Sequence, residues 1–285
     1  MTGANTGPET LGFCCPLCGA ALTREGPAAR CQNGHSFDVA RQGYVHLLPV
    51  NKMHAKLPGD SREMVAARRR FLQAGYYAVF RDALCELALN CAASLGKPGG
   101  EGLRLCDAGC GEGYYTAALA QALPQGEVYG FDISKLAVKA AAGQYKKPRF
   151  AVASSFAIPL PDGFADCLTD VFSPLAEGEF ARVVKPGGYF LYAVPGPRHL
   201  YGMKELLYQE PYENPVRDTE YPGFRFVDRT PVRGVIRILD GDTAQALFAM
   251  TPYYWKTGVT GARRLAETGV FETEIAFDFL RYQRV

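Results

Sequence analysis

The sequence lacks any apolar run that approaches the roughly 20 residues of a membrane helix. Its N-terminus also lacks the basic start and apolar stretch of a signal peptide, so we expect a cytoplasmic protein with no membrane partner. Cysteine occurs nine times, an odd number. Several of these cysteines lie inside apolar patterns, where small buried thiols are ordinary, and no disulfide framework is expected. No internal repeat is found.

The length of 285 residues suits one large globular domain and a smaller one. The formal charge is unevenly distributed, since residues 41–81 carry +6 and the remainder carries −4. Such a basic stretch is either a solvated face or a contact surface for a polyanion. We divide the chain into a flexible tail (1–12), a cysteine-bearing module (13–56), a basic helical linker (57–100) and a large domain (101–285).

Two helices are expected in the linker. Asp60 can cap the first helix reciprocally with Glu63, and this helix should end at Gly75. The second helix should carry its apolar positions at Phe80, Leu84, Leu87 and Leu89.

Beyond residue 100, helices and strands alternate, which predicts an α/β fold with a parallel sheet and right-handed crossovers. Helices are expected near 114–123, 134–145 and 176–183, and strands near 127–131, 148–152, 165–171 and 189–194. Residues 275–281 alternate in polarity and predict a closing strand.

A glycine-rich turn, Cys106-Asp-Ala-Gly-Cys-Gly-Glu-Gly113, follows the first expected strand of the large domain. Asp132 ends the next strand, where an acid can accept hydrogen bonds from ribose hydroxyls. Asp107 at the head of the turn would repel the pyrophosphate of a dinucleotide, but it suits the ammonium group of a methionine moiety. This order predicts S-adenosylmethionine as cofactor, with Gly109 and Gly111 at the turn.

The turn resembles motif I of the class I methyltransferases, which have a Rossmann-like fold. Residues 182–190, which contain Lys185-Pro186-Gly187-Gly188, resemble the turn before the fifth strand of that fold. Three signals in the correct order favour this interpretation over a glycine turn in some other α/β domain.

The cysteine-bearing module contains Cys15, Cys18, Cys31 and His35, with the spacing C-x2-C-x12-C-x3-H. Two close ligand pairs separated by a short ribbon suit a closed, tetrahedral, structural zinc site with one Zn²⁺ per chain. Cys14 is a rival for Cys15, although the x2 spacing favours Cys15. The alternative is a group of buried or reactive thiols.

A zinc module, a basic segment and a methyltransferase domain together suggest an enzyme that grips a polyanion, with RNA as the expected partner. Lys and Arg side chains supply sequence-independent affinity for phosphates, and Arg68, Arg69 and Arg70 are the candidates on the first helix. Tyr253, Tyr254 and Trp255 are candidates for stacking on an exposed base, with the core as the alternative place for these side chains.

Nearly the whole chain resembles the bacterial 23S ribosomal RNA guanine-N1 methyltransferases. The resemblance is carried by runs at 15–18, 35–38, 43–50, 58–61, 67–75, 109–116, 153–155, 182–188, 195–200 and 250–252. The run Pro195-Gly-Pro-Arg-His-Leu200 is more diagnostic than the glycine turn, because generic methyltransferases do not need it.

Members of this family methylate N1 of one guanine in a 23S rRNA hairpin, carry a structural zinc and are described as dimers. The resemblance assigns zinc to the four residues above, and the cofactor to Tyr77, His199 and the turn formed by Gly111, Glu112 and Gly113. Ser154 follows the third strand, where a segment that contacts adenine is usual.

Methylation at N1 of guanine requires removal of a proton, and Asp170 is the best-placed acid in the sequence to accept it. Phe172-Ser173-Pro174 stands where many amino methyltransferases have Asn/Asp-Pro-Pro-aromatic, which favours a ring nitrogen as the target. Two rival functions remain, a small-molecule methyltransferase with a purely structural zinc ribbon and a non-catalytic RNA-binding adaptor.

Overall fold

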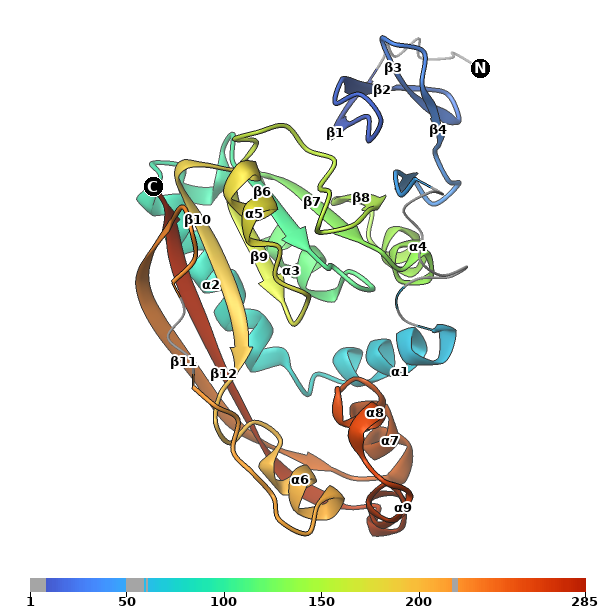
Figure 1. The fold of residues 1–285 in the computed structure, drawn as a ribbon, viewed down its shortest axis with the longest axis vertical. Coiled ribbons are helices and arrows are strands. Elements are labelled where there is room, and N and C mark those ends of the chain that lie inside the picture. The colour runs from blue at the N-terminus through green and yellow to red at the C-terminus, as the bar shows by residue number, and fades with distance from the viewer. Residues whose placement is uncertain (1–8, 50–58, 60, 217–219) are drawn as a thin grey trace.

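A computed structural model describes residues 9–49, 59, 61–216 and 220–285 of the chain. Two sheets form the framework, a large one of eight strands and a small antiparallel one of four strands at one end of the molecule (Figure 1). The predicted α/β architecture is confirmed.

The large sheet has the strand order β11-β12-β10-β9-β6-β7-β8-β5. Strands β5 to β10 pair in parallel, whereas β12 pairs antiparallel with both β10 and β11. The strands are β5 (Val45–His46), β6 (Arg104–Ala108), β7 (Glu127–Asp132), β8 (Arg149–Val152), β9 (Ala165–Val171), β10 (Val184–Pro195), β11 (Phe224–Ile238) and β12 (Phe271–Arg284). The expected closing strand is thus part of β12, which pairs with a second long strand, β11, that the sequence pattern did not predict.

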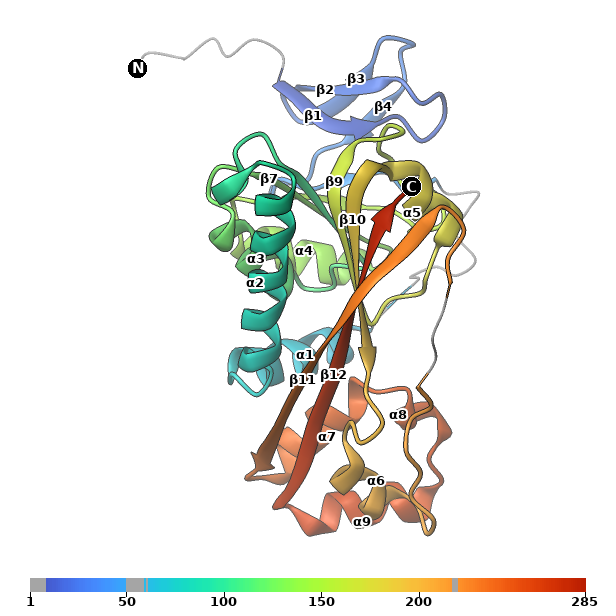
Figure 2. The ribbon, with the colours of Figure 1, turned by 90° about the vertical axis from the view of Figure 1, so that its left-hand side faces the viewer.

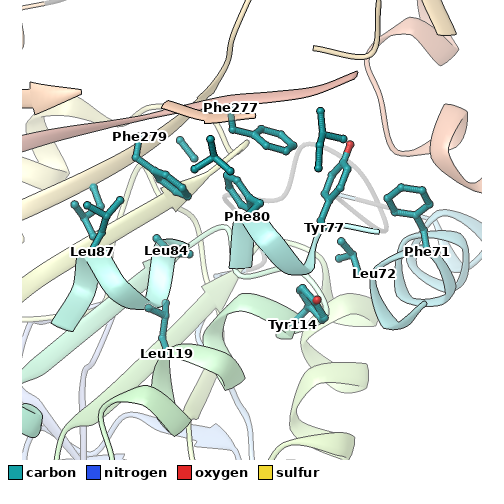
Figure 3. Close-up of a cluster of buried hydrophobic side chains, with 14 of the residues drawn as sticks. Phe71, Leu72, Tyr77, Phe80, Leu84, Leu87, Tyr114, Leu119, Phe277 and Phe279 are labelled. Carbon is teal, nitrogen blue, oxygen red and sulfur yellow. The ribbon is translucent and has the colours of Figure 1, made fainter. Parts of the chain in front are cut away.

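Helices α2 (Ala78–Ser94), α3 (Tyr114–Ala122) and α4 (Lys135–Gln144) lie on one side of this sheet, and α5 (Glu177–Val183) lies on the other (Figure 2). Phe80 of α2 points toward β12, with its ring centroid 4.3 Å from that of Phe277 and 4.7 Å from that of Phe279 (Figure 3). Phe80 and Leu84 are fully buried as predicted, whereas Leu89 is partly exposed. The hydrophobic core therefore packs the linker helix α2 against β12. A 3-10 turn (Pro98–Gly100) leads from α2 into β6.

Helix α1 (Arg62–Gln73) begins after Ser61, whose hydroxyl accepts a hydrogen bond from the backbone N–H of Met64. The expected cap, Asp60, lies outside the described residues, and the Ser61 cap places the helix start one residue later than predicted. The helix ends two residues before Gly75, which has a φ of +86° and terminates the helical path as expected.

The small sheet contains β1 (Glu9–Cys14), β2 (Ala21–Glu25), β3 (Ala28–Cys31) and β4 (Ser36–Asp38). It packs directly on the large domain, with the Phe13 and Tyr129 ring centroids 5.5 Å apart. A Cβ at Gly12 would lie 2.5 Å from the Tyr129 hydroxyl, so the two sheets approach closely here. The expected module (13–56) also contributes β5 to the large sheet, a connection that the sequence pattern did not reveal.

Four further helices gather beside the far ends of β11 and β12 (Figure 1). They are α6 (Tyr201–Leu207), α7 (Gly241–Ala249), α8 (Tyr253–Lys256) and α9 (Val259–Thr268). Helix α7 packs against α1, so this group faces the basic linker helix. In the ranges that the structure describes, no helix has both the length and the apolar character needed to cross a membrane.

Candidate active site and metal centre

A cavity of about 750 Å³ opens at the carboxyl ends of β6, β7, β9 and β10. Parallel α/β sheets place their ligands at this edge. Sequence-predicted residues contribute to its lining from the glycine turn, the strand ends, α1, α2 and α8, and these are Arg68, Tyr77, Gly109, Gly111, Glu112, Asp132, Ser154, His199 and Tyr253. The fold thus brings together residues that lie up to 185 positions apart in the chain.

The glycine turn is held by Asp132. One carboxylate oxygen of Asp132 accepts a hydrogen bond from the Gly111 N–H at 3.0 Å, and the other accepts from the Ser134 N–H at 2.7 Å. A carboxylate oxygen can accept more than one hydrogen bond, so this carboxylate is chemically suited to ribose hydroxyls as well. Gly109 has a φ of +72°, and a Cβ at this position would lie 2.2 Å from Cβ of Ser173. The turn therefore fits only glycine at Gly109.

Glu112 lines the cavity, yet it is almost completely buried, and its Oε2 atom has no hydrogen-bond partner among the described residues. Burial raises the pKa of Glu112 to about 7, against the opposing effect of the Arg68 and Arg69 guanidinium groups. A buried acceptor without a partner at a cavity wall is suited to a ligand that donates hydrogen bonds, such as an ammonium group. The carboxylates of Glu112 and Asp132 therefore fit the ammonium group and the ribose of S-adenosylmethionine.

Asp107 does not line this cavity. Its two carboxylate oxygens accept hydrogen bonds from the hydroxyls of Thr116, at 2.5 Å, and Thr169, at 2.9 Å. Burial raises its pKa to about 6. This geometry does not favour the predicted contact between Asp107 and an ammonium group. The two threonine hydroxyls enclose the Asp107 carboxylate, which stabilises the end of β6 instead.

Gly113 also stays outside the cavity lining. It precedes α3 with a φ of +84°, and a Cβ there would lie 2.8 Å from Cβ of Ala141. A glycine is required at position 113 because α3 and α4 pack closely there. This is a packing role, whereas the prediction was a contact with the cofactor.

Asp170 lies beneath the cavity wall and is fully buried. Its Oδ1 atom accepts a hydrogen bond from the Ser173 N–H at 3.0 Å, while Oδ2 has no partner among the described residues. Burial raises the pKa of Asp170 to about 7. Asp170 does not line the cavity itself, whereas Ser173 does.

His199 is fixed as a neutral hydrogen-bond donor. Its Nδ1 atom accepts a hydrogen bond from the Ala276 N–H at 3.3 Å, so the proton of the neutral ring resides on Nε2. Burial, together with the nearby Lys204, lowers the pKa of His199 to about 3. This residue can therefore donate to a carboxylate or carbonyl oxygen, but it cannot act as a general base. The Tyr77 ring lies beside it, with a centroid separation of 6.2 Å.

Phe172 is a cavity residue that sequence reasoning did not select as part of the site. It has a φ of +59°, a left-handed conformation that is rare for a non-glycine residue and is typical of functional sites. Its half-exposed ring stacks on Phe80, with a centroid distance of 5.6 Å. Only its position next to the methyltransferase-like Ser173-Pro174 pair could have indicated it.

The residues proposed for RNA contact separate into two groups. Arg68 and Tyr253 line the cavity, whereas Arg69, Arg70, Tyr254 and Trp255 do not. Arg70 donates a hydrogen bond to the Asp242 carbonyl oxygen at the start of α7, at 3.5 Å. Trp255 is 73% exposed beside the cavity.

Cys15, Cys18, Cys31 and His35 form a cluster whose four ligand atoms all lie within 4.8 Å of one another. The Cys18 and Cys31 sulfur atoms are 3.8 Å apart, and both Cys15 Sγ and Cys31 Sγ lie 3.5 Å from Nδ1 of His35. A tetrahedral Zn²⁺ with bonds of roughly 2.3 Å to sulfur needs ligand separations of about this size. The cluster fits zinc, and the rival Cys14 is excluded from it.

Known protein families match the cysteine-bearing module and the large domain separately. A family model described as "RlmA, N-terminal" matches residues 13–56, and one described as "Methyltransferase domain" matches residues 100–220. The 23S rRNA (guanine(748)-N(1))-methyltransferase of Streptomyces fradiae is 35% identical over 272 residues, covering 93% of this chain and 94% of that protein.

A candidate 23S rRNA (guanine-N1)-methyltransferase of Micromonospora griseorubida is 38% identical, covering 68% of each chain. A demethylmenaquinone methyltransferase of a Geobacillus species is 32% identical, but covers only 38% of this chain and 52% of that protein.

Proposed function

The chain belongs to the 23S rRNA (guanine-N1)-methyltransferase family, and from this premise we propose that it transfers a methyl group from S-adenosylmethionine to N1 of a guanine in a hairpin of 23S rRNA. The observation that carries the proposal is the combination, in one chain, of a metal cluster fit for zinc and a cavity lined by the glycine turn, Asp132 and His199. The zinc has a structural role, because all four ligands come from the protein.

S-adenosylmethionine, when bound, supplies an electrophilic methyl group on a sulfonium. Asp132, which lines the cavity at the end of β7, would accept hydrogen bonds from the ribose hydroxyls. Glu112 would accept from the amino group, and the Nε2–H of His199 would donate to the carboxylate. Ser154, at the end of β8, would approach the adenine.

The target guanine must lose its N1 proton before or during transfer. His199 cannot accept it, because its free nitrogen is already protonated. We propose Asp170 as the acceptor on the basis of its unpartnered Oδ2 and its pKa of about 7. Since Asp170 lies behind the wall, Ser173 or a water molecule would relay the proton.

The partner is proposed to be the rRNA hairpin, gripped by the zinc ribbon and the arginines of α1, with Tyr253 and Trp255 beside the exposed base. We further propose that the protein acts in the cytoplasm as a homodimer, as the family resemblance implies.

Incubation of the purified protein with S-adenosylmethionine and a hairpin transcript, followed by primer extension, tests the activity. A methyl group on N1 blocks base pairing, so we expect a polymerase stop at one guanine. The same transcript incubated with Asp132→Ala protein, for which we expect a weaker stop, is the matched control. Cofactor binding without a stop on any rRNA hairpin would favour the small-molecule methyltransferase, and absence of cofactor binding would favour the adaptor.

A further inference from the structure

Lys204 of α6 has no exposed surface, although lysine is almost never fully buried without a compensating partner. Its ammonium group donates hydrogen bonds to the Tyr212 carbonyl oxygen at 2.8 Å and to Oδ1 of Asn214 at 2.9 Å. The Tyr212 and Tyr253 ring centroids lie 4.3 Å and 5.4 Å from the nitrogen. Among the described residues no carboxylate forms an ion pair with Lys204.

All four neighbours present negative potential, either a carbonyl oxygen or the face of an aromatic ring, and this is the environment of a cation. Taking a charged amine out of water is costly, and a methionine of the same length would fill the space without that cost. The retained charge therefore calls for a role beyond packing.

The atoms that Lys204 holds belong to the cavity wall. Tyr212, Asn214 and Tyr253 all line the cavity, and they come from the segment after α6 and from α8. Asn214 also donates from Nδ2 to the Gly196 carbonyl oxygen at 2.9 Å, which fixes this segment across the end of β10. One ammonium group thus joins two parts of the wall that are separate in the chain, the segment after α6 and helix α8.

The cavity is electrically asymmetric. Glu112 and Asp132 lie at the end formed by the glycine turn, with Arg68 beside them, and the two acids suit a cationic cofactor. At the part of the wall formed by α8 and the segment after α6, the charged groups are Lys256 in the lining and Lys204 one layer behind it. A base that becomes negative as it loses a proton is stabilised beside such a cationic part of the wall.

We propose that Lys204 is a positioning residue for the target guanine, which holds the wall of Tyr212, Asn214 and Tyr253 in place and whose fixed positive charge favours the N1-deprotonated base. This inference rests on the proposed function, because it needs a substrate that loses a proton. It adds a reason for the choice of guanine N1, a ring N–H that must be deprotonated.

The ionisable groups around Lys204 are few in the part of the chain that the structure describes. Glu213 acts on it with an opposite charge, His199 is neutral, and Tyr212 and Tyr253 present their rings. Helix α9 and strand β12 also pack on α6, but the only described charge that acts appreciably on the ammonium group is that of Glu213. The positive field at this part of the wall therefore comes from Lys204 and from Lys256 in the lining.

The test compares Lys204→Met, Asn214→Asp and the wild type in methylation of the hairpin transcript from pH 6 to pH 9. Both variants should move the rise of kcat upward by about one pH unit, because each cancels the positive field that acts on the bound base, and kcat reports ionisations in the enzyme–substrate complex. Asn214→Asp preserves an oxygen acceptor for Lys204 but loses the Nδ2 donor to the Gly196 carbonyl oxygen. Asn214→Ala loosens the wall in the same way without adding a negative charge, so an unchanged pH profile in this variant separates the charge from the loss of wall packing. Lys204→Met should also raise KM for the transcript by about tenfold through the loosened wall, with an unchanged Kd for S-adenosylmethionine.

Lys147→Met is the matched control, because Lys147 also donates to backbone carbonyl oxygens, those of Ala120 and Pro124, but does not line the cavity. It should leave the pH profile in place. Unchanged pH profiles in both test variants would overturn the proposal. A loss of S-adenosylmethionine affinity in Lys204→Met as large as the rise in KM for the transcript would also overturn it, because the charge would then act on the cofactor. If the wild type itself fails to methylate the transcript, the proposed function fails and the role of Lys204 falls with it.

Discussion

Acidic residues around the glycine turn show how the environment, rather than the residue type, sets the role of a side chain. Asp107 is enclosed by two threonine hydroxyls, Asp132 is bound by two backbone N–H groups, and Glu112 keeps an oxygen without a partner. Only the last two line the cavity. The first prediction therefore concerns Asp132 and the second concerns Glu112.

Asp132→Ala should weaken the binding of S-adenosylmethionine by about 1 to 3 kcal/mol, because the ribose hydroxyls lose a charged acceptor and the Gly111 N–H loses its partner. Isothermal titration calorimetry at constant pH measures this change. The comparison variant is Asp107→Asn, for which we expect a smaller loss of affinity and a lower melting temperature. An unchanged dissociation constant for Asp132→Ala would remove this residue from the cofactor site.

Cofactor affinity should depend on pH through Glu112. Its pKa of about 7 means that the apo protein holds a proton on this carboxyl below neutrality, and a cationic ligand requires the ionised form. Affinity should therefore be full at pH 8 and about tenfold lower at pH 6. Titrations at three pH values check this, and Glu112→Gln should flatten the dependence. A pH-independent affinity in the wild type would contradict the assignment.

At the scale of the element, α1 presents its three consecutive arginines in three directions, because successive residues point about 100° apart. Arg68 reaches the cavity beside Gly111, while Arg70 reaches α7 and bonds the Asp242 carbonyl oxygen. The helix is thus a bridge between the cofactor turn and the C-terminal helices, and not a uniform basic face.

If Arg68 and Arg69 contact phosphates, replacing both with glutamine should lower hairpin affinity and reduce the slope of log affinity against log salt by about one to two units. Arg70→Gln is the internal control, because the Arg70 guanidinium group already donates a hydrogen bond to α7. We expect this variant to lower the melting temperature and to leave the salt slope almost unchanged. Filter binding at several salt concentrations measures both. Equal slopes for wild type and the double variant would leave the basic segment as a solvated linker.

On the scale of the whole molecule, the zinc ribbon is joined to the methyltransferase domain through a shared core. Phe13 packs on Tyr129, the Arg149 guanidinium group donates to the Thr10 carbonyl oxygen at 3.0 Å, and β5 extends the large sheet at β8. The cofactor cavity is lined by residues that follow the carboxyl ends of the strands, whereas Arg149, which contacts the zinc ribbon at Thr10, is the first residue of β8. Loss of zinc should therefore weaken RNA binding more than cofactor binding.

Elemental analysis should find one zinc per chain, and Cys31→Ser should abolish it. This variant should lower the melting temperature and the hairpin affinity, while the Kd for S-adenosylmethionine at 25 °C stays within about twofold. Cys85→Ser, a change in α2 far from the cluster, is the matched control for cysteine replacement. Less than half a zinc per chain in protein never exposed to chelator would count against the site.

The sequence by itself determined the elements whose chemistry is local. The spacing of Cys15, Cys18, Cys31 and His35 specified a metal cluster, and the order of strand, glycine turn and Asp132 specified a parallel sheet with a nucleoside site. These patterns can be recognised in a sequence because a metal knuckle or a glycine turn is built from residues that are neighbours in the chain.

Only the tertiary structure decided which side chains reach the cavity. The enclosure of Asp107 depends on Thr169, 62 residues away, and the fixed tautomer of His199 depends on a backbone N–H 77 residues away. The wall around Lys204 joins α6, α8 and the segment between α6 and β11, and β11 itself is specified by its 14 pairs with β12 and not by a local pattern. Hydrogen bonding and burial between distant segments have no periodic signature in a sequence, so the roles that depend on them follow from the fold.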